Sequence, residues 1–445
     1  MTESLPAVSL FSNCGAGDLG YASAGFRFDV MAEIDKRRLE IALLNHRGAA
    51  GVEGDLRSEW PRVIDAYRRC QSDTAPALLA ACPPCQGMSS ARGGRGREDD
   101  PDAGSRDHRN VLVDVIAEVV HQLAPRAVVV ENVPAFLTRL VNHPRSGKPV
   151  SAARLLTHRL QGKYRVFPFL TDLADYGVPQ TRVRAFLTFV RRDEAGLTSF
   201  DESHHVPYPR PTVPREYGGS GHTTLRSALA DLGAKALDAG SAELATDPED
   251  PLHFVPVWGD DYRYRMVSAI EPGSGGRAWE NSMCCSCGDV SAGPEDAICP
   301  SCAVPLRRPV VREDDGTYRL VRGFRTSSYS RMRPNVPAST VTTASGHVGS
   351  DRTIHPFENR VLSPRECAYL QTFPMDFEWG SALKRWGGSN VRAMIGEAVP
   401  PLFTELHGRA IRSVLDDDWQ IAPASASDPR TEKARERLFR ATATS

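Results

Sequence analysis

The chain has 445 residues, of which 41% are hydrophobic and 24% are charged, and its formal net charge at pH 7 is −1. This composition is typical of a globular protein with room for two domains, or for one large domain with an insertion. It excludes a uniformly basic surface, so any contact with nucleic acid must be local, and no apolar run reaches the length of a membrane span. We therefore expect a cytoplasmic, nucleoid-associated protein that makes no membrane contact.

The first predicted strand is a short apolar run, Val8 to Phe11, and it leads into a small-residue turn, Ser12 to Gly20. A strand, a glycine-rich turn and a helix-compatible segment are how a doubly wound α/β sheet begins. A tight loop without a ligand is an equally frequent explanation of such a turn. A second strand ends in Glu33, which is placed to accept hydrogen bonds from ribose hydroxyls, and a third ends in Asp55, which could accept from an adenine amine.

The apolar run Leu78 to Ala81 ends in Cys82-Pro83-Pro84-Cys85. Neither proline has a backbone N–H to donate, so the strand stops there. A cysteine just past the carboxyl end of a strand lies where open α/β sheets bind ligands, which makes Cys85 a candidate nucleophile. A buried structural cysteine and a Cys82-x-x-Cys85 metal or redox pair are the alternatives. The Gly/Arg-rich segment 91–106 that follows is expected to be a mobile loop.

A helix is expected from Arg109 to Leu123, followed by a buried strand, 127–130, that ends in Glu131. Glu131 is a candidate general acid, although an ordinary helix cap or surface acid is the commoner role for such a residue. The later segment 176–190 predicts a turn and a strand. Its period-two alternation places Gln180, Arg182 and Arg184 on one face, either converging on a site or lining a wet sheet edge.

A proline-rich stretch at 191–214 predicts a domain boundary, and four cysteines beyond it have the spacing of two zinc knuckles: Cys284, Cys287, Cys299 and Cys302. A closed four-thiolate site leaves no open position for chemistry, so a zinc ion there would be structural. Between residues 303 and 335 the chain has eight arginines against three acids, with aromatic residues interleaved. That pattern fits a local nucleic-acid surface as well as it fits a solvated charged face.

Regular pattern returns at 360–374, where Ser363 and Pro364 predict the start of a helix, and a closing helix is expected near 402–414. Beyond Asp416 the composition indicates a dispensable extension or a weak helix.

Taken in order, these stretches resemble the DNA (cytosine-5) methyltransferase family over most of residues 8–190 and 330–412. The segments that carry the resemblance are Leu10-Phe11-Ser12 with Cys14-Gly15, Glu33, Gly54-Asp55, Pro83-Pro84-Cys85-Gln86, Arg109-Asn110, Glu131-Asn132-Val133, Gln180-x-Arg182-x-Arg184, Arg365-Glu366 with Leu370-Gln371-x-Phe373-Pro374, and Gly396 with Ala398-Val399-Pro400-Pro401. Each segment alone is weak, and the ordered set is specific.

The resemblance implies a Rossmann-like class I methyltransferase sheet with a smaller, irregular, zinc-containing target-recognition domain. The implied boundaries are a catalytic domain at 1–190, a target-recognition domain at 191–380 with its zinc knuckle at 284–302, a return to the catalytic domain at 381–416, and a C-terminal extension at 417–445.

The resemblance also implies S-adenosylmethionine as methyl donor. The residues that would contact it are Phe11, Ser12, Cys14, Gly15, Glu33, Ile34, Asp55, Leu56, Pro84, Leu112, Glu397 and Val399. Two positions depart from the family pattern. Asn13 stands where glycine is usual, but asparagine tolerates positive φ better than most residues. Glu397 stands where asparagine is usual, which puts cofactor affinity in doubt.

By resemblance, the Cys85 thiolate adds to C6 of cytosine, Glu131 protonates or hydrogen-bonds N3, and Arg184 with Arg182 neutralises charge near O2. The target base must be flipped out of the duplex, and the loop 91–106 would close over it. The residues expected to contact DNA are Gln86, Ser89, Arg92, Arg95, Arg97, Arg322, Arg325 and Arg331.

The expected partner is double-stranded DNA, bound by a monomer in restriction–modification or phage defence, with restriction or defence proteins as further candidate partners. Two other functions stay open on the sequence. One is methylation of tRNA cytosine, against which the long recognition insert stands. The other is a catalytically weak DNA-binding regulator.

Overall fold

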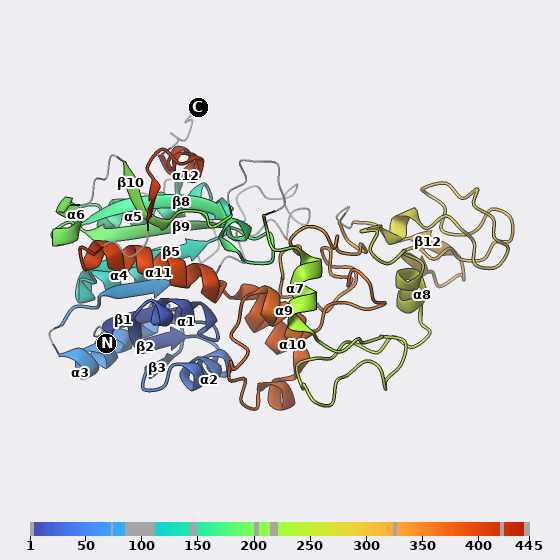
Figure 1. Ribbon diagram of the computed structural model, residues 1–445, viewed down its shortest axis with the longest axis horizontal. Coiled ribbons are helices and arrows are strands. Elements are labelled where there is room, and N and C mark those ends of the chain that lie inside the picture. The colour runs from blue at the N-terminus through green and yellow to red at the C-terminus, as the bar shows by residue number, and fades with distance from the viewer. Residues whose placement is uncertain are drawn as a thin grey trace.

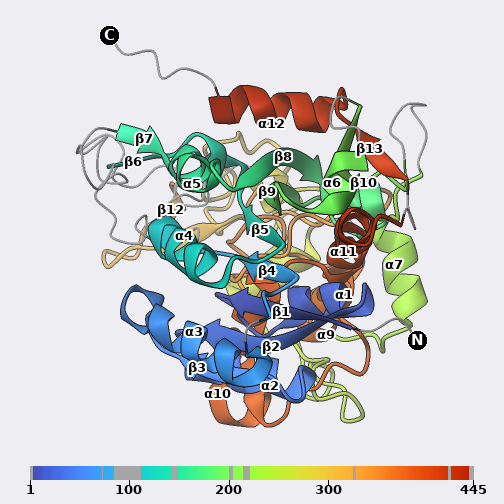
Figure 2. The ribbon, with the colours of Figure 1, turned by 90° about the vertical axis from the view of Figure 1, so that its left-hand side faces the viewer.

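The structure is a computed structural model that describes residues 4–72, 74–84, 112–142, 149–199, 204–213, 221–323, 327–418 and 422–439. Its centre is a seven-stranded sheet with the order β3-β2-β1-β4-β5-β9-β8 (Figures 1 and 2). The strands are β1 Leu5–Leu10, β2 Phe26–Glu33, β3 Ala50–Glu53, β4 Leu78–Ala81, β5 Ala127–Asn132, β8 Tyr164–Asp172 and β9 Val183–Arg191. The mixed α/β fold on a central sheet is confirmed.

The first five strands of the sheet run parallel, and β9 is antiparallel to both β5 and β8. The central strands β4 and β5 carry apolar runs that are buried along their whole length. Strands buried on both faces read as continuous hydrophobic runs because helices cover each side. The carboxyl ends of β1, β2, β4 and β5 therefore lie along one edge of the sheet, where ligands bind in such folds.

Helices cover both faces of the sheet and continue into a second, irregular lobe (Figure 2). They are α1 Ala16–Ser23, α2 Lys36–Asn45, α3 Leu56–Gln71, α4 Leu112–Leu123, α5 Ala152–Leu160, α6 Ala195–Ser199, α7 Leu225–Leu232, α8 Tyr262–Ser268, α9 Pro364–Leu370, α10 Ala382–Glu397, α11 Pro401–Leu415 and α12 Pro429–Phe439. Helices α3, α4, α5 and α12 share a core with one face, and α1, α2 and α11 share a core with the other. Among the described residues, no helix is both long and apolar enough to cross a bilayer.

The remaining elements are short. They are the 3₁₀ helices η3 Pro134–Leu137, η4 Leu173–Tyr176 and η5 Ala278–Glu280, and the strand pairs β6 Leu140–Asn142 with β7 Pro149–Ser151, β10 His205–Pro209 with β13 Pro423–Ser425, and β11 Val310–Arg312 with β12 Tyr318–Leu320. The predicted domain boundaries stay a prediction, but β10 packs its Val206 and Tyr208 into the core of the sheet. The chain thus remains with the sheet beyond residue 191.

The composition of the segment after Asp416 left a dispensable extension or a weak helix as the expectations, and the structure has the short strand β13 and the helix α12 there. Strand β13 pairs antiparallel with β10, and α12 buries Thr431, Ala434 and Leu438 on the side of α5 and β8. Its first turn is tied down because the Arg430 guanidinium pairs with Asp175 at 2.7 Å. Scattered alanines and a single leucine in a charged sequence gave too weak a periodicity to reveal this packing.

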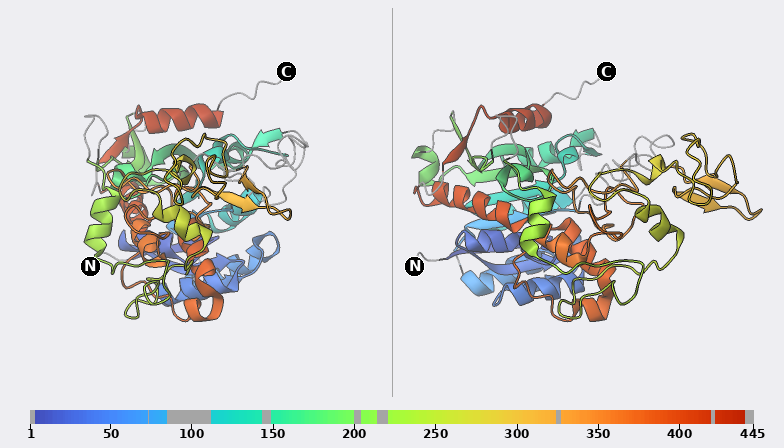
Figure 3. Two further views of the ribbon diagram at one scale, coloured as in Figure 1. Left: turned by 90° about the vertical axis from the view of Figure 1, so that its right-hand side faces the viewer. Right: turned by 45° about the vertical axis from the view of Figure 1, so that its right-hand side comes forward.

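Residues 221–360 form the irregular lobe, which extends away from the sheet (Figures 1 and 3). Its main core gathers around Trp258, Met266 and Tyr329. A separate cluster at residues 284–306 contains only Cys284, Cys299 and Leu306 as buried members. So small a core cannot hold a fold by hydrophobic burial alone, which calls for a covalent or metal cross-link there.

Candidate active site and metal centre

The end of β1 forms a tight turn whose backbone requires unusual conformations. Phe11, Asn13 and Gly15 have φ values of 58°, 48° and 76°. The expectation that Asn13 accepts positive φ in place of glycine is confirmed. The Asn13 side chain donates to the Met394 carbonyl at 2.8 Å, while its buried Oδ1 accepts no hydrogen bond from any described residue. A buried acceptor of this kind is suited to a donor on a bound ligand.

Glu33 closes this turn from the end of β2. Its Oε2 accepts from the Asn13 N–H at 2.9 Å and its Oε1 from the Asp35 N–H at 3.1 Å. Burial raises the pKa of Glu33, and these two backbone donors oppose the rise. The next residue, Ile34, leaves 66% of its surface exposed. A buried carboxylate beside an exposed apolar side chain provides a hydrogen-bond acceptor for a ribose and an apolar contact for a purine ring.

The other residues predicted to contact the cofactor divide into two groups. Ser12, Cys14, Leu56 and Leu112 are buried, so they shape the wall behind the turn. Asp55 is the N-cap of α3, where it accepts from the Arg57 N–H at 2.9 Å and pairs with the Arg57 guanidinium at 2.5 Å. Asp55 thus caps a helix, a role that was not expected from the sequence, and its half-exposed carboxylate stays accessible as an acceptor.

The last motif brings α10 and α11 against the same turn. The Cβ of Val399 would lie 3.2 Å from a Cβ added to Gly17, so only glycine allows this approach without adjustment. Glu397 forms a hydrogen-bonded ion pair with Arg38 of α2. Sequence reasoning missed Arg38. The only signal for it was a basic residue five positions beyond Glu33, in the first turn of the next helix.

At the next strand ends, Glu131 lies between an arginine and a cysteine. Glu131 is 6% exposed, its Oε1 is 2.9 Å from Arg184 Nε, and its Oε2 is 2.7 Å from Cys82 Sγ. The Asn132 amide donates to the Pro83 carbonyl at 2.9 Å and so ties the Pro-Pro turn to β5. Pro84 is half-buried and ends the described part of this turn.

Gln180 and Arg182 share a face with Arg184 in the sequence but have different surroundings. Arg182 is fully buried, and its guanidinium donates to the carbonyls of Val341, Gly396 and Ala398 at 3.1, 3.0 and 2.9 Å. Arg184 pairs with Glu131. The contacts of Arg182 tie its strand to two distant segments, and its predicted catalytic role stays a prediction.

Several predicted residues lie outside the described part of the chain, so their positions stay predictions. They are Cys85, Gln86, Ser89, Arg92, Arg95, Arg97 and Arg325. The same holds for the loop 91–106 and for Arg109 and Asn110.

The four predicted metal ligands come together at the tip of the irregular lobe. The sulfur atoms of Cys284, Cys287, Cys299 and Cys302 all lie within 4.8 Å of one another. The Cys284–Cys302 and Cys287–Cys299 sulfur separations are 3.5 and 3.6 Å. Tetrahedral zinc–thiolate bonds of about 2.3 Å would place sulfur atoms about 3.8 Å apart, so the donor set fits Zn²⁺.

The two cysteine hairpins have the same backbone design. The N–H of Gly288 donates to the Cys284 carbonyl at 3.0 Å, and that of Ala303 donates to the Cys299 carbonyl at 2.9 Å. Both donors have positive φ, 75° and 57°. Each hairpin therefore presents its thiols from a preformed turn. Cys285 is exposed and belongs to neither pair.

The arginine-rich stretch is less available to DNA than its composition suggested. Arg331 is 0% exposed, and burial lowers its pKa to about 10. Its guanidinium donates to the carbonyls of Ile270 and His355, both at 2.9 Å, and to Asn359 Oδ1 at 2.6 Å. These hydrogen bonds give Arg331 a structural role, and its predicted contact with DNA stays a prediction. Arg322 is exposed and stays a candidate.

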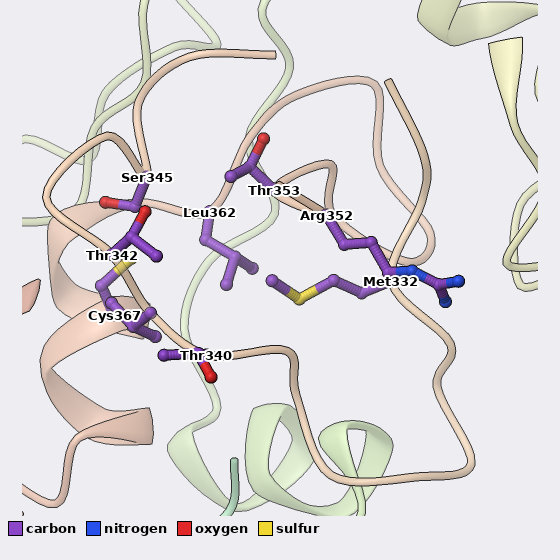
Figure 4. A pocket seen from close by; sticks show the side chains of 9 residues that line it. Met332, Thr340, Thr342, Ser345, Arg352, Thr353, Leu362 and Cys367 are labelled. Carbon is purple, nitrogen blue, oxygen red and sulfur yellow. The ribbon is translucent and has the colours of Figure 1, made fainter. Parts of the chain in front are cut away.

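A small pocket lies away from these groups, between segment 340–353 and α9 (Figure 4). Its empty volume is about 210 Å³, and its lining includes Thr340, Thr342, Ser345 and Cys367. None of its lining residues is a predicted catalytic or cofactor residue, so we do not assign it to the site.

The amino-acid sequence matches a known protein family. The C-5 cytosine-specific DNA methylase family matches residues 5–413. Type II methyltransferase M1.HgaI of Avibacterium volantium is 24% identical over 91% of this chain and 97% of its own length. Type II methyltransferase M1.HphI of Haemophilus parahaemolyticus is 27% identical over 92% of this chain and 87% of its own.

Two solved structures have a similar fold. One is the crystal structure of a candidate DNA modification methyltransferase encoded within an E. coli prophage, which is 22% identical with a TM-score of 0.56 and covers 93% of this chain and 100% of that one. The other is the Entamoeba histolytica methyltransferase EhMeth, which is 12% identical with a TM-score of 0.51 and covers 94% of this chain and 99% of that one. The family match spans nearly the whole chain. The chain therefore belongs to the C-5 cytosine-specific DNA methylase family.

Proposed function

We propose that the protein methylates C5 of a cytosine flipped out of double-stranded DNA, using S-adenosylmethionine. The observation that carries this proposal is the cluster at the ends of β4 and β5. There Glu131 is held by Arg184 beside the Pro83-Pro84 turn, and Cys85 follows that turn in the chain. An acid, a cation and a nucleophilic thiol are the groups that addition to a pyrimidine requires.

The reaction begins with attack of the Cys85 thiolate on C6. Negative charge then develops on N3 and O2 of the ring, where Glu131 supplies a proton or hydrogen bond and Arg184 supplies positive charge. C5 becomes an enamine-like nucleophile as a result. After methylation a base removes the C5 proton, the electron pair of that bond restores the ring double bond, and Cys85 leaves as thiolate.

S-adenosylmethionine would supply an electrophilic methyl group at the ends of β1 and β2. Glu33 would bind its ribose, Phe11 and Ile34 would flank its adenine, and Asp55 would accept from the adenine amine. The Oδ1 of Asn13, which accepts no hydrogen bond within the described part of the chain, and the exposed Ile34 support a ligand at this position. Val399 and Pro84 would line the same space, with Glu397 paired to Arg38 at its edge.

We further propose that Cys284, Cys287, Cys299 and Cys302 bind a structural Zn²⁺ that supports a target-recognition domain. Their mutual distances and the small core around them support this assignment. The names of the curated relatives favour a role in type II restriction–modification, with a function in phage defence as its biological purpose. Exposed Arg322 and the residues predicted in the segment 86–97 would contact the DNA.

The decisive experiment is covalent trapping. The protein is incubated with S-adenosylmethionine and DNA in which cytosine is replaced by 5-fluorocytosine, and adducts are separated on denaturing gels. Fluorine at C5 cannot leave as a proton does, so the enzyme should stay bound in about one-to-one ratio. Cys85→Ala should form no adduct. Absence of any adduct with the wild-type protein would overturn the proposed reaction, and bisulfite sequencing of DNA from expressing cells would identify the target sequence.

A further inference from the structure

Cys82 follows the last residue of β4, and the sheet brings it to Glu131. In the parallel pair β4–β5, Ala81 lies opposite Val130, so the next residues along the two strands are Cys82 and Glu131. Their side chains meet with Cys82 Sγ 2.7 Å from Glu131 Oε2. The register of two buried strands therefore places Cys82 beside Glu131, and the two side chains then meet.

Each oxygen of the Glu131 carboxylate has its own neighbour. Arg184 Nε lies 2.9 Å from Oε1, and the thiol of Cys82 occupies the Oε2 side. The turn after Cys82 is fixed in addition, because Asn132 binds the Pro83 carbonyl at 2.9 Å. A carboxylate held at both ends cannot rotate freely about its terminal bond, so its orientation is set before a substrate arrives.

We propose that Cys82 is a positioning residue for Glu131, a role that rests on the function proposed above. A thiol is a weak hydrogen-bond donor. It can orient Oε2 and still yield that oxygen to a cytosine ring at low cost, whereas a strong donor would compete with the base. The two cysteines of the Cys82-x-x-Cys85 motif then have separate roles: Cys82 orients the carboxyl group of Glu131, and Cys85 attacks the cytosine ring.

The test measures transfer of labelled methyl groups from S-adenosylmethionine to unmethylated bacteriophage λ DNA by Cys82→Ala, Cys82→Ser and the wild type. Loss of one neutral hydrogen bond to a reacting group corresponds to a fall in kcat of about three- to tenfold. The KM values for both substrates should change less than about twofold, because Cys82 touches neither in this proposal. Cys82→Ser should recover part of kcat, because a hydroxyl also orients Oε2 but, as a stronger donor, yields that oxygen to the base less readily than a thiol does. Cys70→Ala, an exposed cysteine on α3, is the matched control and should behave as wild type.

The sharper measurement repeats Cys82→Ala in a Glu131→Gln background. If Cys82 acts through Glu131, the second change should cost no further activity, because non-additivity is expected of residues that act as one unit. Additive losses, a kcat equal to wild type in Cys82→Ala, or a rise in KM without a fall in kcat would each overturn the proposal. A wild-type protein that transfers no methyl group would instead refute the proposed function, so the two failures are distinguishable.

Discussion

Replacing Glu366 with Gln should destabilise the junction between the lobe and the sheet by about 3 kcal/mol. Glu366 is 2% exposed, and its two oxygens accept from Arg360 Nη1 at 2.7 Å and Arg360 Nη2 at 2.8 Å. The carboxylate also accepts from the Ser363 N–H at 2.7 Å, which completes the capping box of α9. Loss of this group leaves the buried Arg360 with only the Glu358 carboxylate as an ionic partner among the described residues.

The magnitude follows from the linkage between protonation and folding. Burial alone would raise the pKa of Glu366, but the Arg360 guanidinium outweighs it and lowers the pKa from 4.5 to about 2. That fall corresponds to about 3 kcal/mol of folded-state stabilisation, since each pKa unit is worth about 1.4 kcal/mol. Because the folded-state pKa is depressed, the contribution is complete above pH 4.5 and is lost as the pH falls towards 2.

The assay is urea unfolding followed by tryptophan fluorescence. Glu366→Gln and wild type should differ by about 3 kcal/mol at pH 7, and the difference should shrink below pH 4.5. The neighbouring Arg365→Gln is the matched control, because the Arg365–Asp250 pair is partly exposed and should contribute about 1 kcal/mol or less. If the two variants lost equal stability, or if the Glu366→Gln deficit persisted unchanged at pH 3, the electrostatic reasoning would be refuted.

Three other predictions concern the cofactor edge, the metal centre and the C-terminus. Arg38→Gln should weaken S-adenosylmethionine binding about fivefold by calorimetry, because it leaves Glu397 without its ionic partner. Adding Glu397→Asn should restore the affinity, and equal weakening in the double variant would contradict this explanation. Purified protein should contain about one zinc ion per chain by mass spectrometry. Cys299→Ser should lose both the metal and DNA binding while retaining S-adenosylmethionine binding. A metal-free protein that still binds DNA would disprove the structural role of the zinc ion. Truncation after residue 418 removes β13 and α12 and should lower the free energy of unfolding by about 3 kcal/mol, judged from the burial of Leu438 and Ala434. An unchanged melting temperature would show that the segment is dispensable for stability.

The strand ends could be predicted from the sequence because two features coincide there. Apolar runs mark buried strands, and the residue that ends each run, such as Glu33 or Glu131, lies at the edge of the sheet although its side chain is buried. Two-residue periodicity likewise put Arg182 and Arg184 on one face. It could not say what lies opposite each of them, since the carbonyl of Val341 that binds Arg182 comes from 159 residues later in the chain.

The same limit explains why composition could not separate buried arginines from exposed ones in the segment 303–335. Arg331 and Arg308 count as positive charges in the sequence, but both are buried and donate to backbone carbonyls. An irregular lobe leaves many carbonyls without secondary-structure partners, and a guanidinium with five donors is suited to satisfy them. In such a lobe, the number of arginines therefore reflects both those that donate to backbone carbonyls and those that are free to bind phosphate.

The tie made by Arg182 also limits how this protein can be re-engineered. One buried guanidinium joins the carbonyl of Val341, in the irregular lobe, to those of Gly396 and Ala398 at the end of α10. Gly396 approaches the backbone so closely that an added Cβ would lie 2.4 Å from the Thr342 carbonyl carbon. If the lobe of a relative were grafted onto this protein, both sides of this contact should stay unchanged. Residues 180–182 and 338–342 should therefore come from the same parent protein.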